Sequence, residues 1–404
     1  MVMTPKVSAA MKFTHFLSIA ARNILIPIIS ILQITLIIRI SGVKLWTVLA
    51  IGVSLGGIAQ ALIDRGYANS GSSLLLKQHN LYFLATDSIR HRFPVFVACI
   101  LVGLLPFLVV NPFRYDLIYL SFFSLCLSGL SVDWVLISGR KSIQLFLSSV
   151  IPRLVTSIIG LTAYVFTHNI SFILYSSIIG VVLNILLGVG FLHSMKIPVE
   201  NRGRNLLGKQ EYLLRITNDI IWLMPIPLVN SYSPVIAPLF TFSDRLVKFP
   251  LLSIWSITQF LTSDILSSRD KFRRKIHISL LIHAIIGMIF GISTFLLLPR
   301  IAPFISNDAL RFDSRECLYL GLFAFFLIVA LPLTQQYFLL TNQKELILKI
   351  NCVFLLVSFL LYSSGVLIFS KLLFFQAILQ ASVFFLFLYI YIHQEFFAKN
   401  LTSS

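Results

Sequence analysis

The sequence predicts an all-α protein that crosses a membrane many times. Of its 404 residues, 57% are hydrophobic and only 12% are charged, and the mean hydropathy is +0.92. A soluble domain carries roughly 25% charged residues, so this surplus of apolar side chains excludes an ordinary soluble protein. The apolar residues form runs that are long enough to cross the hydrocarbon core as helices.

Twelve apolar spans follow one another along the chain. The first, preceded by Lys6 and Lys12, has about 25 residues, which is too long for a signal-peptide core and predicts a membrane helix. Prolines inside several spans, such as Pro152 and Pro225, predict kinks. The predicted spans are 14–38, 43–63, 94–110, 115–138, 142–167, 170–194, 213–230, 235–263, 277–299, 317–340, 350–370 and 372–393.

The basic residues divide the connections between these spans into two alternating sets. One set, which includes both ends of the chain, holds 20 Lys and Arg residues, and the opposite set holds 7. Cytoplasmic loops are enriched in Lys and Arg, so both termini are expected in the cytoplasm. All the connections rich in Lys and Arg fall on one side of the membrane only if the chain has twelve spans. This separation also accounts for the net charge of +17 without a nucleic-acid partner.

The longer connections indicate how the spans are grouped. The connection 195–212 falls after six spans, which predicts one six-helix bundle at 1–194, a cytoplasmic linker at 195–212 and a second bundle at 213–404. The connection 64–93 mixes apolar and basic residues from Ser73 to Leu84, and predicts a short amphipathic helix on the inner membrane surface.

Eight charged residues lie inside the predicted spans beyond the first two positions, and they are the candidates for a transport site. An ion at such a depth costs several kcal/mol unless it is paired or faces water. At about 1.5 Å per residue, one of them, Asp133, lies roughly 10 Å inside the membrane, and another, Arg153, roughly 16 Å inside. The eight are Arg22, Asp133, Arg153, Arg215, Asp219, Asp244, Arg245 and Lys248.

The spacing and sign of these charges predict an anionic substrate. Arg215 with Asp219, and Asp244 with Lys248, are four residues apart and can pair on one helix face. Such pairs can also serve only to fix helix packing, and Arg215 can extend to the membrane surface. The excess of cations predicts a wet central cavity for a phosphate or pyrophosphate group. The cavity of a cation exporter is expected to have a net charge of the opposite sign.

No motif for ATP hydrolysis, metal binding or covalent catalysis accompanies these charges. The sequence has no Gly-rich phosphate loop, and its eight His residues are scattered. The four cysteines lie in apolar runs and are predicted to be buried thiols: Cys99, Cys126, Cys317 and Cys352. We therefore expect a transport protein and not an enzyme, with no metal and no organic cofactor.

Three stretches carry a family resemblance. The first is Ile40–Ala50 with Leu62–Gly71, the second is Asp133–Trp134 with Gly139–Lys141 and Pro152–Val155, and the third is Phe242–Lys248. Together with the number and layout of the spans, they resemble the Wzx-type O-antigen and polysaccharide flippases of the multidrug/oligosaccharidyl-lipid/polysaccharide (MOP) exporter superfamily. Thr47 and Val135 depart from the pattern of that family.

The resemblance implies a specific function. A Wzx-type flippase moves an undecaprenyl-pyrophosphate-linked repeat unit from the inner to the outer leaflet of the bacterial inner membrane, by alternating access between two six-helix bundles of the MATE/MOP type. It would work beside a polymerase and other polysaccharide-assembly proteins, and coupling to a proton or sodium gradient is proposed for relatives. Asp133, Arg153, Asp244, Arg245 and Lys248 lie in the matching stretches, whereas Arg22 rests on its depth alone.

Two other functions stay open. A small-molecule or drug antiporter of the same fold would present the same spans, but the cationic excess argues against it. A membrane polymerase or acyltransferase is disfavoured because the longest outer connection, 300–316, leaves little room for an external active site.

Overall fold

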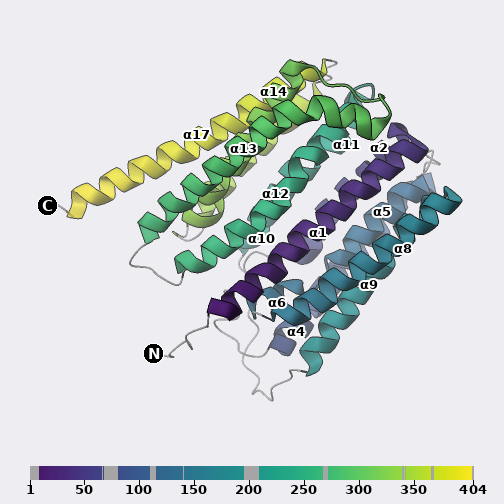
Figure 1. The fold of residues 1–404 in the computed structure, drawn as a ribbon. Helices are drawn as coiled ribbons and strands as arrows, with labels where there is room; N and C mark the ends of the chain where they lie inside the picture. Colours follow the sequence, from purple (N-terminus) through teal and green to yellow (C-terminus); the bar gives the residue numbers. More distant parts are fainter. Residues whose placement is uncertain are drawn as a thin grey trace. The chain divides into compact units, whose positions relative to one another are not determined.

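The described part of the chain, seen in a computed structural model, is built from α-helices with short π-helical turns (Figure 1). It comprises residues 9–65, 67, 81–109, 115–139, 141–194, 209–266, 272–338, 341, 343–364 and 368–402. The predicted fold class, all-α with many apolar helices, is confirmed. Contacts divide the chain into two compact units, Met1–Asp219 and Ile220–Ser404.

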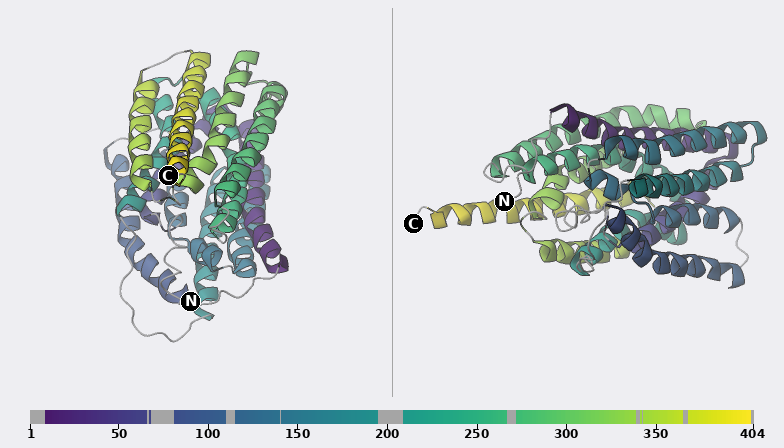
Figure 2. Two further views of the ribbon diagram at one scale, coloured as in Figure 1. Left: turned by 90° about the vertical axis from the view of Figure 1, so that its left-hand side faces the viewer. Right: turned by 90° about the horizontal axis from the view of Figure 1, so that it is seen from below.

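The first unit contains long apolar helices, two of which are interrupted. α5 and α6 are separated by the residues 129–132, and one π-helical stretch, η1, lies between α7 and α8. α2 packs against α5, and α8 against α9 (Figure 2). The helices are α1 (Ala9–Ser41), α2 (Val43–Asp64), α4 (Leu81–Val109), α5 (Tyr115–Ser128), α6 (Asp133–Ser138), α7 (Ser142–Leu145), η1 (Phe146–Val150), α8 (Ile151–Thr167) and α9 (Ser171–Ser194).

The second unit begins within α10, and it too contains long helices and one π-helical stretch, η3, among its described residues. α13 packs against α14, and α14 against α17. An Asp313 capping box starts α14: the side chain accepts from the Glu316 N–H, and the Glu316 carboxylate accepts from the Asp313 N–H. The helices are α10 (Lys209–Leu223), α11 (Pro225–Tyr232), α12 (Ala237–Leu266), α13 (Phe272–Ser306), α14 (Ser314–Leu331), η3 (Pro332–Tyr337), α16 (Lys344–Ser363) and α17 (Phe369–Thr402).

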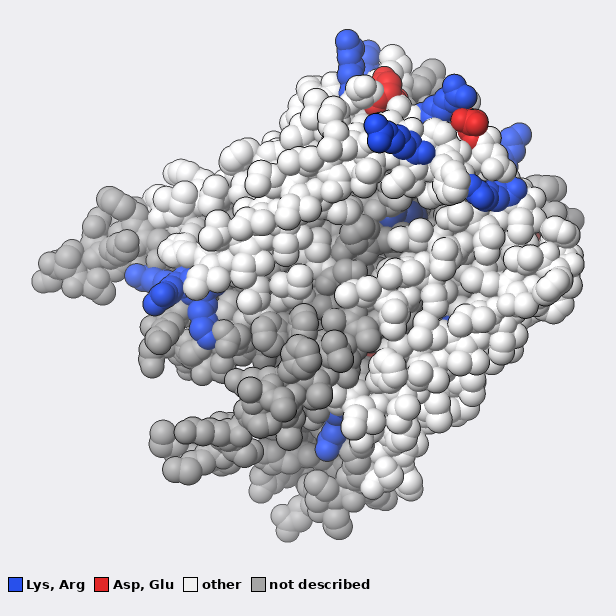
Figure 3. Space-filling view, viewed as in Figure 1, with Lys and Arg blue, Asp and Glu red and all other residues white. Residues whose placement is uncertain are grey.

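The helices have the length and composition of membrane spans. Ten of them in the described ranges are long and apolar enough to cross a membrane, and the pair α10–α11 makes an eleventh if it is one bent span. α12 has 30 residues and is also long enough, but it contains Asp244, Arg245 and Lys248. With α12 included, the helices fit the twelve predicted spans. On the face shown in Figure 3, most Lys and Arg residues gather near helix ends, with uncharged surface between them.

One prediction about the connections needs correction. Leu81 and Leu84 do not belong to a surface helix, because α4 begins at Leu81 and Leu84 is buried in a core cluster with Trp134 and Leu136. The remainder of that predicted helix, within 68–80, lies outside the described residues, as does the segment 195–208 of the predicted linker.

The boundary between the two units lies later than the predicted linker 195–212. It falls after Asp219, inside α10. One contact of α10 with the first unit joins the guanidinium carbon of Arg65 and the Tyr212 ring, whose centroid lies 5.9 Å away.

Gly291 and Gly321 allow α13 and α14 to approach closely. A Cβ atom added to Gly321 would lie 2.7 Å from the Gly291 carbonyl oxygen, which belongs to the backbone and has no rotamer by which to move away. We therefore expect Gly321→Val to destabilise the protein by roughly 1–3 kcal/mol. Thermal unfolding in detergent measures the effect. The control is Gly190→Val in α9, because a Cβ added there meets nothing within 4 Å; equal melting temperatures for the two variants would contradict the prediction.

Candidate functional site

Asp133 is held in a buried polar network inside the first unit. It opens α6, and its carboxylate accepts hydrogen bonds from Ser149 Oγ at 2.8 Å and from Asn184 Nδ2 at 3.0 Å. The three residues lie on α6, η1 and α9, and Asp133 is only 3% exposed. An anion buried in this way needs such donors to replace its lost hydration.

Pro152 explains why the chain forms a π-helical turn beside Asp133. Proline has no N–H, and its ring clashes with the carbonyl four residues earlier, which here is that of Ser148. η1 covers that position, and the Ser148 carbonyl oxygen instead accepts a hydrogen bond from Asn184 Nδ2 at 3.0 Å. Asn184 therefore joins the Asp133 carboxylate to the backbone that Pro152 disturbs. Single π-helical turns of this kind often occur at functional sites.

Arg153 follows this proline in the first turn of α8, where α8 and α9 approach closely. A Cβ added to Gly180 of α9 would lie 2.4 Å from Thr156 Oγ1 and 3.5 Å from the Arg153 Cα atom. Arg153 is half-buried. The sequence argument placed both Arg153 and Asp133 in the membrane interior, and the structure places both in the segment of this unit where helical geometry is interrupted.

Lys248 and Asp244 form the ion pair that their spacing predicted. Lys248 Nζ lies 2.5 Å from Asp244 Oδ1, and Asp244 is buried. Lys248 also donates to the carbonyl oxygen of Trp222 and lies 5.6 Å from the centroid of the Trp222 ring. Trp222 is in the last turn of α10, where carbonyl groups lack helical partners and a cation is favourable.

The other four candidate residues lie in three helices, α1, α10 and α12. Asp219 lies in α10 and Arg245 in α12. Arg22 lies in α1 and Arg215 in α10, but their side chains are outside the described residues. The pairing of Arg215 with Asp219, and a central cavity that collects these charges, therefore stay predictions.

Arg92 is a buried charge that the sequence argument missed. It was counted among the loop cations of 64–93, but it lies in α4 and is 0% exposed. Its Nη1 atom donates to the carbonyl oxygens of Gly129 at 2.8 Å and Ser131 at 3.0 Å, which belong to the break between α5 and α6. It also lies 3.7 Å from Asp64 Oδ1.

The Arg92 contacts continue to the Asp133 region. The Arg92 guanidinium carbon lies 5.6 Å from the centroid of the Tyr67 ring, and that ring packs against Trp134 with centroids 5.3 Å apart. A sequence signal was present: Leu81, Leu84, Ala85 and Ser88 precede Arg92 at helical spacing, which extends the apolar face of α4 toward its N-terminus.

Solved transporter structures share this fold. A MATE transporter in complex with MaL6 aligns with a TM-score of 0.62 at 14% identity over 96% of this chain and 97% of that chain. An outward-facing multidrug resistance MATE family transporter of the MOP superfamily aligns with a TM-score of 0.61 at 12% identity, over 96% and 95%. A MOP superfamily transporter from Pyrococcus furiosus, described as having a binding pocket of reverse polarity, aligns with a TM-score of 0.61 at 12% identity, over 96% and 98%.

These likenesses concern the fold. No protein-family model matches the sequence, and a search of curated proteins found no match. At such low identity the chain has the fold of MATE/MOP transporters, a multi-pass membrane architecture. Function has to be argued from the chain's own charged residues.

Proposed function

We propose that this protein, which has the fold of MOP-superfamily transporters, is a flippase for lipid-linked oligosaccharides. Its substrate is an undecaprenyl-pyrophosphate-linked repeat unit of O-antigen or another polysaccharide. It moves this substrate from the cytoplasmic to the periplasmic leaflet of the bacterial inner membrane by alternating access, with both termini in the cytoplasm. The product then passes to a polymerase and other assembly proteins.

The excess of basic over acidic side chains within the spans carries this proposal. Five basic residues accompany three acidic ones at these positions. Asp133 accepts hydrogen bonds from the neutral side chains of Ser149 and Asn184, and the pair Asp244–Lys248 is balanced in charge. Four of the five basic residues are arginines. Guanidinium groups match phosphate oxygens in a bidentate geometry, which suits a pyrophosphate group.

A drug or small-molecule antiporter is the second candidate. It is favoured by one observation: among the solved structures with this fold is one described as a multidrug resistance MATE family transporter. The Pyrococcus furiosus transporter with this fold is described as having a binding pocket of reverse polarity that suggests a different function, so we use the charge of the site to choose between the two candidates. The sign of the charge excess here favours an anionic substrate.

The test is the leaflet on which the lipid-linked repeat unit accumulates after deletion of the gene. We expect intermediates that face the cytoplasm and resist a glycosidase restricted to the periplasm, together with loss of the surface polysaccharide. The measurement is the fraction of lipid-linked sugar released by the enzyme in intact cells. Lysed cells, in which all the sugar is accessible, provide the control.

Each other outcome would contradict the proposal. Accumulated intermediates that are open to the glycosidase would mean that flipping is intact and that the protein acts later, as a polymerase or ligase. No accumulation, combined with efflux of a cationic dye from cells that express the protein, would favour the antiporter.

A further inference from the structure

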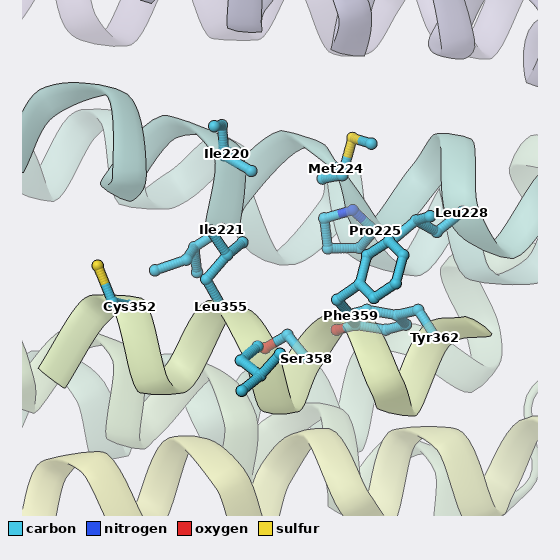
Figure 4. A pocket seen from close by; sticks show the side chains of 11 residues that line it. Ile220, Ile221, Met224, Pro225, Leu228, Cys352, Leu355, Ser358, Phe359 and Tyr362 are labelled. Atoms are coloured by element: carbon cyan, nitrogen blue, oxygen red, sulfur yellow. The ribbon is translucent and has the colours of Figure 1, made fainter. Parts of the chain in front are cut away.

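The second unit contains a cavity of about 330 Å³ between α16 and the junction of α10 with α11 (Figure 4). This volume is within the range of small-ligand sites, about 300–1,000 Å³. Its walls are apolar apart from the side chains of Cys352, Ser358 and Tyr362. They are formed by Ile220, Ile221, Met224, Pro225, Leu228, Cys352, Leu355, Leu356, Ser358, Phe359 and Tyr362.

The break between α10 and α11 accounts for this cavity. The two helices meet at an angle of 41°. Pro225 and Pro227 have no N–H, so the carbonyl groups of Ile221 and Leu223 lose their helical donors and α10 cannot continue in a straight line. Helix pairs normally pack with few voids larger than a water molecule. The bend keeps α11 from closing against α16 along the whole of its length.

A second, smaller cavity of about 40 Å³ shares walls with the first and is less apolar. Ile221, Pro225, Ser358 and Tyr362 line both. The smaller one also has the side chains of Lys248, Gln376 and Gln380 in its wall. The second unit therefore has an apolar cavity that can hold an apolar chain. A smaller cavity with the cationic side chain of Lys248 in its wall lies next to it.

Lys248 has donor capacity left for a ligand. An ammonium group has three N–H donors. Among the described residues, Lys248 uses two of them, on the Asp244 carboxylate and on the carbonyl oxygen of Trp222. The smaller cavity, with Lys248 in its wall, therefore favours an anionic oxygen.

We infer that these adjoining cavities bind the phosphate end of an isoprenyl lipid carrier. The first isoprene units lie in the apolar cavity between α10–α11 and α16, and an oxygen of the attached phosphate accepts a hydrogen bond from Lys248. This inference rests on the proposed function and extends it: the chain recognises the carrier at the junction of its lipid and phosphate parts. The repeat-unit sugar does not enter this site.

Cys352 is a natural reporter for the test, because it lines the apolar cavity and is exposed. The purified protein in detergent is labelled with N-ethylmaleimide, and peptide mass spectrometry follows each thiol separately. At a farnesyl phosphate concentration of ten times Kd, we expect the labelling of Cys352 to slow about tenfold. Cys99, which lies in the first unit, is expected to label at an unchanged rate.

Three further ligands identify which part of the molecule is recognised. Farnesol supplies the chain without the phosphate, inorganic phosphate supplies the anion alone, and phosphatidylglycerol supplies the acyl chains of an ordinary membrane lipid. We expect each of them to require at least about a tenfold higher concentration than farnesyl phosphate, as one charged hydrogen bond implies for farnesol. Equal protection by farnesol or by phosphatidylglycerol would overturn the inference.

Variants test the two cavities separately. The double variant Asp244→Asn/Lys248→Gln removes the cation without leaving a buried unpaired carboxylate, and is expected to make farnesyl phosphate no better than farnesol. Leu355→Trp fills the apolar cavity and is expected to abolish protection. Its control is Val353→Trp, since Val353 is also on α16 but is 64% exposed and does not line the cavity.

Failure of this inference can be told apart from failure of the proposed function. If Leu355→Trp cells flip the lipid-linked repeat unit as well as Val353→Trp cells do, the cavity is not a carrier site, and the flippase proposal stands. If deletion of the gene causes no accumulation of inward-facing intermediates, the flippase proposal fails, whatever the labelling of Cys352 shows.

Discussion

Arg92→Leu is expected to destabilise the first unit by about 3–5 kcal/mol, the usual cost of removing one partner of a buried ion pair. Arg92 donates to the carbonyl oxygens of Gly129 and Ser131, and it pairs with Asp64. The substitution leaves two carbonyl groups and a carboxylate buried without that donor. Because these carbonyls belong to the break between α5 and α6, the position of Asp133 at the start of α6 is also expected to loosen.

Thermal unfolding of the purified protein, together with the yield of monodisperse protein, measures this effect. Arg90→Leu is a matched control: Arg90 is on the same helix, two residues earlier, and it is exposed. A surface substitution of this kind usually changes stability by less than about 0.5 kcal/mol. If Arg92→Leu melts at the same temperature as Arg90→Leu, the guanidinium does not hold this break together.

Most of the fold could be predicted because the bilayer limits the choice of structure. A chain that spans hydrocarbon must satisfy its backbone hydrogen bonds within each helix, so apolar runs of sufficient length give the helices directly. The start of α4 was predicted too late because Arg92 and Asp87 lower the hydropathy of its first turns. Hydropathy does not distinguish a charge in a loop from a charge that is fully bonded inside a helix bundle.

The candidate site was predictable only where its contacts are local. The pair Asp244–Lys248 follows from one helical turn. The partners of Asp133 are not local: Ser149 is 16 positions away and Asn184 is 51 positions away. Neither carries a charge, so nothing in the sequence marked them. Pro152 predicted a kink, but not that the Ser148 carbonyl would bond to Asn184.

Cysteine exposure shows the same limit. Cys126 and Cys317 are buried as predicted, whereas Cys99 is only partly buried and Cys352 is exposed. All four lie in apolar runs, but Cys352 is on a face of α16 where Val353 and Leu356 are also exposed, at 64% and 60%. In a membrane helix both the lipid-facing and the core-facing residues are apolar, so composition alone does not predict burial.

Arg153→Ala is expected to reduce flipping at least about tenfold, because a hydrogen bond to a charged group contributes about 1.5–3 kcal/mol. The variant is expected to insert into the membrane at the wild-type level, since Arg153 is half-buried and α8 and α9 pack through Gly180 and Thr156. The measurement is the fraction of lipid-linked repeat unit that faces the periplasm in cells expressing the variant. Surface polysaccharide is expected to decline in parallel.

Arg153→Lys separates the role of charge from that of geometry. Lysine keeps the positive charge but lacks the planar fork that binds two phosphate oxygens, so its activity is expected to lie between those of the wild type and Arg153→Ala. The control is Arg300→Ala, since Arg300 is exposed in α13. This variant is expected to flip the lipid-linked repeat unit at the wild-type level. Full activity of Arg153→Ala would remove Arg153 from substrate binding. Equal loss of activity and of membrane-inserted protein would assign it a structural role, in holding α8 beside the Asp133 network.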